Sequence, residues 1–402
     1  MSKSKSSTPA LITTLLITAG LIGGGLWYLN KTSPGLVSGI TGQPSSSSNA
    51  PRSATQLTLL GDTFSGYSTF RSGEFQSVLA EFGLGLQYED EFDQAARAER
   101  LSNGEADLMV TTLDQFLQQQ PQGQIIGLID RTIGADAVVL NTRQYPELTS
   151  LQNISAVLQT AQTQGTSLKV VYAGDTPSEY LALVLDTKFE AFNLSDFEVV
   201  KVTDASEAWS LMQDPANNVA IAVLWEPFIT QAKQQGKKVV LSSQDAPGSI
   251  VDVIVASDRL LQSNPQQVSE LLEAYYRRID ANVRDSSQLQ AQIAEDGGLS
   301  PADAGAVLQG IDFFTAAEAQ SWMQEGTLKT RIEAIAAVLV LSGRLNNVPA
   351  NPENLYTAEY LTKAATNTNT LVELVRADNP ELADRLSGDN AQTVAVPQVT
   401  AE

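Results

Sequence analysis

Short runs of apolar and β-branched residues recur along the first two thirds of the chain, and stretches with helical spacing separate them. Such a run of four to eight residues between turn residues is typical of a buried strand. Runs of this kind occupy residues 57–61, 84–88, 106–110, 125–130, 135–141, 168–173, 197–202, 219–224, 238–241 and 250–256. Strands that alternate with helices predict α/β units around mainly parallel sheets.

The helices expected between these runs occupy residues 74–81, 93–103, 151–164, 179–189, 204–212 and 228–235. Asp93 and Asp204 stand at the start of two of them and are expected to cap the helix N-termini. After Pro265 the spacing of apolar residues becomes helical. Helices are expected there at residues 266–283, 301–310, 316–324, 328–342 and 357–366, and a disordered tail at residues 391–402.

The N-terminal region contains a segment that is long enough to cross a membrane. Residues 10–29 carry no charge, and about 20 apolar residues are what a spanning helix needs. Trp27 and Tyr28 fall where an interfacial aromatic belt would lie, and Lys3 and Lys5 predict that the N-terminus stays in the cytoplasm. A cleaved secretory signal is the alternative, although no small-x-small cleavage site follows at once.

We therefore expect residues 1–31 to be an uncleaved signal anchor. Residues 32–55 are rich in Ser, Gly and Pro and are expected to form a flexible tether. The body of the protein is then periplasmic or otherwise extracytoplasmic, and it is anchored to the inner (cytoplasmic) membrane by residues 10–29.

The composition narrows the chemistry that is open to the chain. With 402 residues and 43% hydrophobic composition, it can build two lobes with cores of their own. It contains no cysteine and no histidine. Disulfides, Ser-His or Cys-His nucleophile pairs and nearly all zinc sites are therefore excluded. Carboxylate chemistry and hard-metal sites are the only kinds of active site that remain open. Because the usual catalytic groups are missing, we expect no enzyme. We also expect no cofactor and no metal.

The charge is distributed unevenly along the chain. The first 54 residues carry four basic residues and no acidic one, while the remainder holds all 46 acidic residues and 21 of the 25 basic ones. A surface this acidic repels nucleic acids and anionic lipid headgroups. We therefore expect no nucleic-acid partner, and contact with the membrane only through the N-terminal helix.

The apolar run at residues 219–224 ends in Trp225-Glu226-Pro227 and thus delivers an aromatic ring and a carboxylate to its C-terminal end. Ligands of open α/β sheets bind at the C-terminal ends of strands, and Pro227 favours an end to the strand at this point. Trp225 and Glu226 are therefore candidate ligand-binding residues. The alternative is a buried tryptophan that caps a core strand, with Glu226 in solvent.

Other strand ends carry further candidates. They are Asp62, Phe64, Ser65, Gly66, Tyr67 and Arg71 after the first strand, Thr111, Thr112 and Asp114 after the third, Thr176 and Ser178 after the sixth, and Asp252 in the last. Each has a purely structural alternative: a surface loop for residues 62–67, helix caps for the hydroxyl groups and Asp114, and a hinge for Asp252. Arg71, the only base near the loop, either clamps an anion or stays solvated.

The order of these features resembles a known family. The segments that carry the likeness are Ser65-Gly66-Tyr67, Asn103-Gly104-Glu105-Ala106-Asp107, Thr111-Thr112-Leu113-Asp114, Ala208-Trp209-Ser210-Leu211-Met212, Trp225-Glu226-Pro227, Pro247-Gly248-Ser249-Ile250-Val251-Asp252, and Asn264-Pro265 with Tyr275. Over residues 56–365, the chain resembles solute-binding proteins of ABC transporters for nitrate, sulfonates, taurine and related molecules. These markers point to the family and not to one ligand.

The resemblance implies an α/β, two-lobed type II periplasmic binding protein fold, here with an N-terminal transmembrane helix and extra C-terminal helices. Two crossovers join the lobes, and the ligand binds in the cleft between them, which closes by a hinge motion. On this basis lobe one is expected at residues 56–143 and 250–345, lobe two at residues 144–249, and a C-terminal helical extension at residues 346–390.

The function implied is that of an exported, membrane-tethered solute-binding protein for an ABC importer, with permease and ATPase subunits as partners. Its solute would be a small polar molecule that contains nitrogen or sulfur, of the nitrate, sulfonate and taurine class. A sensory or scaffold domain of the same fold, without transport, is the alternative, and the membrane anchor keeps it open. Pyrimidine-precursor synthases share the fold, but the resemblance implies that their chemistry needs an active-site histidine, which this chain lacks.

The residue types at the expected cleft bear on the charge of the solute. Asp62, Asp114, Glu226 and Asp252 provide four carboxylates, against the single guanidinium of Arg71. This set differs from a simple anion trap and favours amines or ring N–H groups, as in taurine or an aminopyrimidine.

Overall fold

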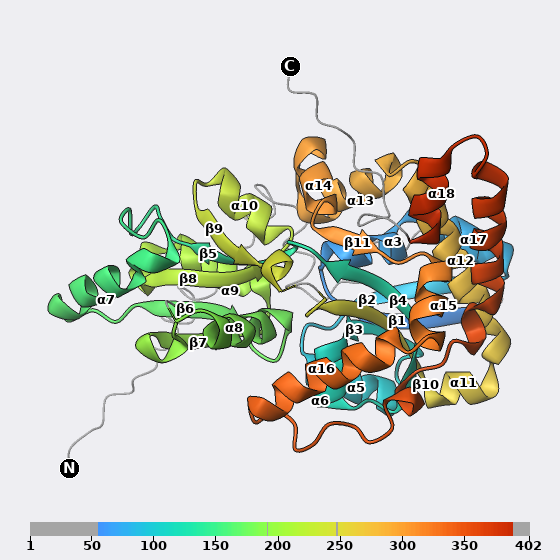
Figure 1. Cartoon of the computed structure of the whole chain (residues 1–402), viewed down its shortest axis with the longest axis horizontal. Coiled ribbons are helices and arrows are strands. Elements are labelled where there is room, and N and C mark those ends of the chain that lie inside the picture. Colours follow the sequence, from blue (N-terminus) through green and yellow to red (C-terminus); the bar gives the residue numbers. More distant parts are fainter. Residues whose placement is uncertain (1–54, 191, 247, 389–402) are drawn as a thin grey trace, which may run out of the picture. The chain divides into compact units, whose positions relative to one another are not determined.

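The computed structural model describes residues 55–190, 192–246 and 248–388, and the fold is given for these ranges. Their strands form two sheets, one of six strands and one of five (Figure 1). We call the six-stranded sheet with its helices lobe one and the five-stranded sheet with its helices lobe two. The predicted signal anchor, nearly all of the tether and the C-terminal tail lie outside the described residues. Within those residues, no helix is both long and apolar enough to span a bilayer.

Lobe one contains strands in the order β11-β4-β10-β3-β1-β2. Their bounds are β1 (Thr55–Gly61), β2 (Leu84–Asp90), β3 (Leu108–Thr112), β4 (Gly123–Thr132), β10 (Val251–Ser257) and β11 (Ile311–Phe313). β1 pairs in parallel with β2 and β3, whereas β10 pairs antiparallel with both β3 and β4. The short edge strand β11, which no apolar run predicted, is antiparallel to β4.

Lobe two contains strands in the order β7-β6-β8-β5-β9. Their bounds are β5 (Asp136–Leu140), β6 (Lys169–Ala173), β7 (Glu198–Val202), β8 (Val219–Trp225) and β9 (Lys238–Ser242). β6 is parallel to β7 and to β8. β5 lies antiparallel to both of its neighbours, β8 and β9.

The chain passes between the two sheets twice, and these crossovers explain why the sheets are mixed. Residues 133–135 connect the end of β4 to the start of β5, and residues 243–250 connect the end of β9 to the start of β10. A strand that begins where its neighbours end must run against them. The prediction of mainly parallel sheets therefore needs a correction at β5 and β10, the strands that receive the crossovers, and at the unpredicted β11.

Helices of four to twenty residues connect and cover the strands. They are α3 (Ser68–Arg71), α4 (Gly73–Glu81), α5 (Gln94–Ser102), α6 (Leu113–Gln119), α7 (Ile154–Thr163), α8 (Pro177–Lys188), α9 (Ala205–Gln213), α10 (Phe228–Gln234), α11 (Asp258–Ser263), α12 (Pro265–Arg284), α13 (Ser287–Gly297), α14 (Pro301–Leu308), α15 (Ala316–Gln324), α16 (Thr327–Leu341), α17 (Thr362–Val375) and α18 (Pro380–Ser387). The 3₁₀ helices are η1 (Ser65–Tyr67), η2 (Leu151–Asn153), η3 (Leu194–Asp196), η4 (Pro215–Asn217), η5 (Ser243–Asp245), η6 (Pro352–Leu355) and η7 (Glu359–Leu361).

The structure confirms the two predicted helix caps. Asp93 accepts a hydrogen bond from the amide of Ala96 at the start of α5, and Asp204 accepts one from the amide of Ser206 at the start of α9. Helices α3, α11 and α13 were not predicted, whereas α18 lies within the residues expected to form a C-terminal helical extension. Helix α17 runs to Val375, well past the expected end at residue 366.

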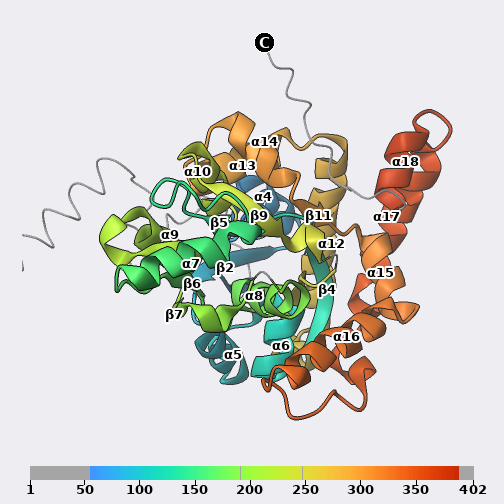
Figure 2. The ribbon, with the colours of Figure 1, turned by 60° about the vertical axis from the view of Figure 1, so that its left-hand side comes forward.

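Helix α12 forms the centre of the packing in lobe one. Its apolar face buries Leu271, Leu272, Tyr275 and Tyr276 completely or nearly so. The Tyr275 ring stacks on Phe70 with the ring centroids 4.6 Å apart. Figure 2 shows α12, α15, α17 and α18 gathered on one side of β4, while α16 lies beside α6.

Strand β4 carries extra residues relative to β10. Asp252 lies opposite Asp130, but the next residue of β10, Val253, lies opposite Leu128, so Ile129 has no partner in β10. An inserted residue changes the face on which the following side chains of a strand lie. The bulge therefore puts Asp130 on the same face as Asp252, where regular pairing would place Ile129.

Tyr276 of α12 binds this irregular part of β4. Its hydroxyl donates a hydrogen bond to the carbonyl oxygen of Leu128 at 2.8 Å and accepts one from the Leu128 amide at 3.0 Å. Gly127 leaves the necessary room, because a Cβ at that position would lie 3.0 Å from the hydroxyl oxygen. One side chain thus satisfies both main-chain groups of the residue next to the bulge.

We expect Tyr276→Phe to lower the free energy of unfolding by about 1–3 kcal/mol, the usual cost of leaving buried polar groups without a partner. Urea unfolding followed by circular dichroism measures this change. Tyr145→Phe is the control, because Tyr145 is half-buried and its hydroxyl makes no hydrogen bond to any residue that the structure describes. Equal stability of the two variants would show that the Tyr276 hydroxyl does not hold the bulge.

Candidate functional site

The loop that follows β1 meets the end of β8. The Ser65 hydroxyl donates a hydrogen bond to the carbonyl oxygen of Glu226 at 3.5 Å. The amide of Glu226 donates to the carbonyl of Ala135, which lies in the first crossover, at 2.9 Å. Residues of lobe one and lobe two thus come together where β1 and β8 end, through Ser65 and Glu226.

The loop itself is tightly organised. Asp62 accepts a hydrogen bond from the Phe64 amide at 2.9 Å, and the rings of Phe64 and Tyr67 meet edge to face with centroids 5.2 Å apart. Gly66 leaves no room for a side chain, because a Cβ there would lie 2.5 Å from an oxygen of Asp130. The Tyr67 hydroxyl donates to Asp252 at 2.5 Å. The loop therefore covers two carboxylates of the sheet beneath it.

These two carboxylates, Asp130 and Asp252, are the central feature of the site. They lie directly opposite each other on β4 and β10, and Thr112 of β3 lies opposite Asp252 on its other side. The exposed fractions of Asp130 and Asp252 are 0% and 1%. Among the residues that the structure describes, no group donates a hydrogen bond to either oxygen of Asp130 or to the second oxygen of Asp252.

Asp136 is the third member of this acidic group. It begins β5 and lies directly opposite Trp225 of β8, so the two side chains share a face of the sheet in lobe two. Its exposed fraction is 2%. The Trp225 indole is also buried, and its N–H donates to no acceptor in the described part of the chain.

Burial is the main reason why these carboxyl groups have raised pKa values. Burial and the neighbouring carboxylates of Asp136 and Asp312 raise the pKa of Asp130 well above its ordinary value. Burial and the charge of Asp130 do the same for the pKa of Asp252. For Asp136, burial and the nearby carboxylates raise the pKa to about 8. Ionisation of one carboxyl group therefore makes ionisation of the others less favourable, and a cation beside them would favour the ionised forms.

Within the described ranges no basic side chain forms an ion pair with these three carboxylates, and only the charge of Arg131 lowers the pKa of Asp130. Arg131 follows Asp130 in β4 but points to the other face, where it pairs with Asp312 at 2.5 Å and with Glu318 at 2.8 Å. Its guanidinium also lies over the Phe314 ring, 4.5 Å from the centroid. The nearest positive charge in the sequence is therefore engaged elsewhere.

Asp62, by contrast, has a basic partner that the sequence did not reveal. Arg97 of α5 is completely buried and donates to Asp62 at 2.9 Å and to the carbonyl oxygen of Val110 at 2.8 Å. The expectation that Arg71 is the only base near the loop is therefore wrong. Only the three-dimensional fold brings Arg97 here, since 35 residues separate it from Asp62.

Arg71 is engaged by the protein. Its guanidinium pairs with Asp296 of α13 at 2.8 Å and donates to the carbonyl oxygens of Asp62 and Phe64 at 2.9 and 3.2 Å. These contacts fix the loop after β1. The guanidinium is therefore neither solvated nor free to clamp an anion. We therefore exclude Arg71 from the site that we propose.

The remaining candidates are buried at strand ends and serve partly as local hydrogen-bonding groups. The Thr111 hydroxyl donates to Gln94, Asp114 accepts from Gln115 in the first turn of α6, and Glu226 accepts from the amide and hydroxyl of Thr230. Burial raises the pKa values of Asp114 and Glu226.

At the start of α8, the Thr176 hydroxyl donates to the Ala173 carbonyl and accepts from the Ser178 amide. The Ser178 hydroxyl is fully buried and has no partner among the described residues. Because β6 and β8 pair directly, Ser178 lies at the strand end next to that of Trp225.

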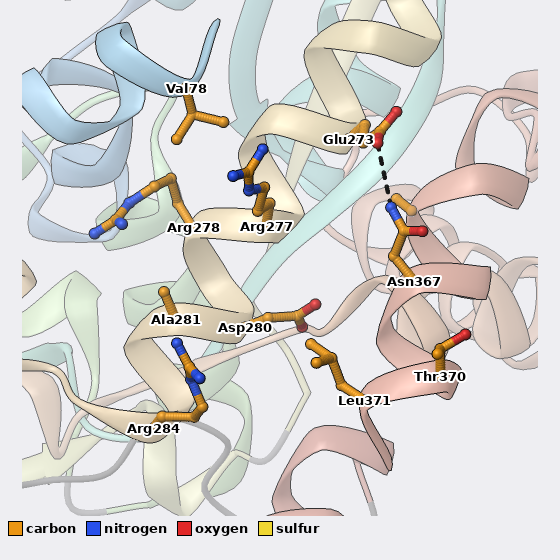
Figure 3. A pocket seen from close by; sticks show the side chains of 11 residues that line it. Val78, Glu273, Arg277, Arg278, Asp280, Ala281, Arg284, Asn367, Thr370 and Leu371 are labelled. Carbon is orange, nitrogen blue, oxygen red and sulfur yellow. Dashed lines mark hydrogen bonds between the residues drawn. The ribbon is translucent and has the colours of Figure 1, made fainter. Parts of the chain in front are cut away.

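Two other kinds of site can be assessed. In the described ranges, no three Asp or Glu residues converge in a way that would hold a metal ion. A groove of about 630 Å³ lies between α12 and α17, and none of the predicted residues lines it (Figure 3). Its lining mixes Arg277, Arg278 and Arg284 with Glu273 and Asp280, so its charges select no single ligand class.

Comparison with solved structures places this geometry in a known fold. The chain matches the alkanesulfonate-binding protein SsuA from Xanthomonas axonopodis pv. citri bound to MOPS with a TM-score of 0.55 and 14% identity, over 76% of this chain and 96% of that one. It matches the periplasmic nitrate-binding protein NrtA from Synechocystis PCC 6803 with a TM-score of 0.58 and 15% identity, over 79% and 90%. The chain has the two-lobed periplasmic binding protein fold.

An enzyme shares this periplasmic binding protein fold. A mutant of the desulfurization enzyme DSZB in complex with biphenyl-2-sulfinic acid matches with a TM-score of 0.52 and 14% identity, over 78% of this chain and 99% of that one. No family model and no curated protein matches the sequence. At these identities the fold is established, and the site must be judged on its own residues.

We expect Arg97→Met to lower the free energy of unfolding by about 3–5 kcal/mol, because it leaves the Asp62 carboxylate without its buried partner. Arg277→Met is the matched control, since that arginine forms an exposed pair with Glu81, and such pairs contribute about 0–1 kcal/mol. Urea unfolding measures both changes. Comparable losses in the two variants would contradict the importance assigned to Arg97.

The pKa of Asp136 predicts how stability depends on pH. This pKa is about 8 in the folded chain against an ordinary value of 3.8, so the folded state binds the proton more tightly. Its contribution to stability is complete below about pH 4 and is lost as the pH rises towards 8, at up to about 1.4 kcal/mol per pH unit. Asp136→Asn should flatten this decline in ligand-free protein, as urea unfolding at a series of pH values would show. Asp378→Asn, an exposed control, should preserve it.

Proposed function

We propose that the chain is a solute-binding protein that holds a small polar molecule, containing nitrogen or sulfur, between its two lobes. The observation that carries this proposal is a buried polar site to which both lobes contribute. Asp130, Asp252 and the loop around Ser65 come from lobe one, and Asp136 and Trp225 come from lobe two. Several polar atoms of these residues have no partner in the described chain, and buried polar groups of this kind are expected to bond to a ligand.

The fold supports the same function. SsuA and NrtA, which share it, are named as alkanesulfonate-binding and nitrate-binding proteins. Two crossovers of a few residues join the lobes of this chain, so rotation about residues 133–135 and 243–250 would open the site. A ligand that contacts both lobes stabilises the closed arrangement by its differential affinity.

The proposal extends to the setting of the protein. Residues 10–29 would anchor it to the outer face of the cytoplasmic membrane, where it would deliver the solute to the permease and ATPase subunits of an ABC importer. Catalysis is not part of the proposal. The chain has neither cysteine nor histidine, so it cannot form the usual Ser-His or Cys-His nucleophile pairs.

The full-length chain, purified in mild detergent under non-denaturing conditions, should carry one small molecule in native mass spectrometry. After dialysis, rebinding of that molecule should change the tryptophan fluorescence, because Trp225 faces the site. Trp225→Phe should abolish most of this signal.

Trp209→Phe is the control, since Lys237 covers that ring in another part of lobe two, with its ammonium nitrogen 5.0 Å from the centroid. If the purified chain carries no small molecule and none of a broad panel of solutes binds it, the solute-binding proposal is wrong and the scaffold alternative takes its place.

A further inference from the structure

We infer that the solute carries a protonated amine or amidine group, which Asp130 and Asp252 hold, together with a hydrogen-bond acceptor that faces Trp225. This inference rests on the proposed function and specifies the chemical class of the ligand. Its basis is the position of four groups. Lobe one contributes the partly unpaired carboxylates of Asp130 and Asp252, and lobe two contributes the Asp136 carboxylate and the unpaired indole N–H of Trp225.

The first argument concerns the free oxygens of the acidic pair. The bulge in β4 places Asp130 opposite Asp252, and Tyr67 occupies only one of the four carboxylate oxygens. The other three accept no hydrogen bond within the described residues. Ionised carboxylates only accept hydrogen bonds, so the group that satisfies them must be a donor. An ammonium or amidinium group supplies two or more donors and a positive charge.

The second argument excludes the other partners of a carboxylate pair. Arg131, which follows Asp130 in the chain, and Arg97, which lies beside the loop after β1, pair with Asp312 and Asp62. Metal coordination is not supported, because no three acidic side chains converge suitably in the ranges that the structure describes. An anion alone would meet repulsion from Asp130, Asp252 and Asp136. A proton held on the pair satisfies it in the ligand-free chain, and an organic cation is the ligand that would take its place.

The third argument comes from lobe two and is independent of the acidic residues. The Trp225 indole N–H is buried, with an exposed fraction of 6% for the residue, and it finds no acceptor in the described part of the protein. An indole N–H donates only, so it calls for an acceptor such as a sulfonate, carboxylate or carbonyl oxygen. This donor in lobe two complements the acceptors Asp130 and Asp252 in lobe one. A molecule with both an amine and an acceptor fits this combination.

The proton balance agrees with the geometry. Burial and mutual repulsion raise the pKa values of Asp130 and Asp252, so the ligand-free pair binds protons more tightly than exposed carboxylates do. A cation that enters favours the ionised carboxylates and displaces that proton. Ligand binding is therefore expected to release protons and to become tighter as the pH rises through the raised pKa values of this pair.

Three probes that differ by one group each test the inference. The probes are 2-aminoethanesulfonate, ethanesulfonate, which lacks the amine, and ethylammonium, which lacks the sulfonate. Calorimetry with the full-length chain at neutral pH should show binding of 2-aminoethanesulfonate. Binding of ethylammonium should be weaker, and binding of ethanesulfonate should be roughly tenfold to a hundredfold weaker than that of 2-aminoethanesulfonate, because charge-assisted hydrogen bonds are lost.

Variants of the acidic pair provide the second half of the test. Asp130→Asn and Asp252→Asn should each weaken 2-aminoethanesulfonate binding roughly tenfold or more, through the loss of a charge-assisted bond. Both variants should keep or raise the melting temperature of the ligand-free chain, because each removes a buried carboxylate that lacks a cation. Glu89→Gln, which alters a partly exposed pair with Arg100, is the control and should leave the affinity unchanged.

The outcomes separate this inference from the function on which it rests. Equal affinity for ethanesulfonate and 2-aminoethanesulfonate, or unchanged affinity in both Asn variants, would overturn the cationic ligand while solute binding stands. Failure of every amine probe, alongside a co-purifying molecule that contains no basic nitrogen, would overturn it as well. Absence of any bound molecule would instead contradict the solute-binding function itself.

Discussion

Two buried carboxylates, Asp130 and Asp252, lie opposite each other on neighbouring strands, and this like-charge pair constrains the whole site. Such a pair is unfavourable unless it is protonated or accompanied by a cation. The protein does not supply that cation from its described residues, since Arg131 and Arg97 bind other acids. The surrounding structure therefore has to be stable enough to hold an arrangement that it would not adopt for stability alone.

Several features of the fold serve to hold this arrangement. The crossovers make β5 and β10 begin at the edge where other strands end, which brings Asp136 and Asp252 there. The bulge turns Asp130 towards Asp252, and the Tyr276 hydroxyl satisfies the main chain beside it. Gly66 then lets the loop after β1 close over the pair without a clash. Each feature is local, but together they fix one site.

The sequence named those residues of the proposed site that follow regular strands. Apolar runs end just before Asp62, Thr111 and Trp225, and strand ends meet in an α/β fold. Asp130 escapes prediction because a bulge leaves no mark in an apolar pattern. Asp136 lies within an apolar run and so was not among the candidates, although an acid near the start of such a run is a usable signal. Arg97 was beyond reach, because a long side chain on a distant helix reaches Asp62 only through the fold.

The charge of the site also gives a physical reason for closure to depend on the ligand. When Asp136 of lobe two approaches Asp130 and Asp252 of lobe one, three carboxylates lose water together, and without a cation the closed form is penalised. A ligand with an ammonium group removes this penalty in the closed form. In the same form, the acceptor group of the ligand receives a hydrogen bond from the Trp225 N–H. The same carboxylates that make the ligand-free closed form unfavourable thus make the ligand bind the closed form more tightly than the open form. This difference in affinity drives closure. On this inference, the fold shared with SsuA and NrtA is used in this chain for a ligand that carries an ammonium group.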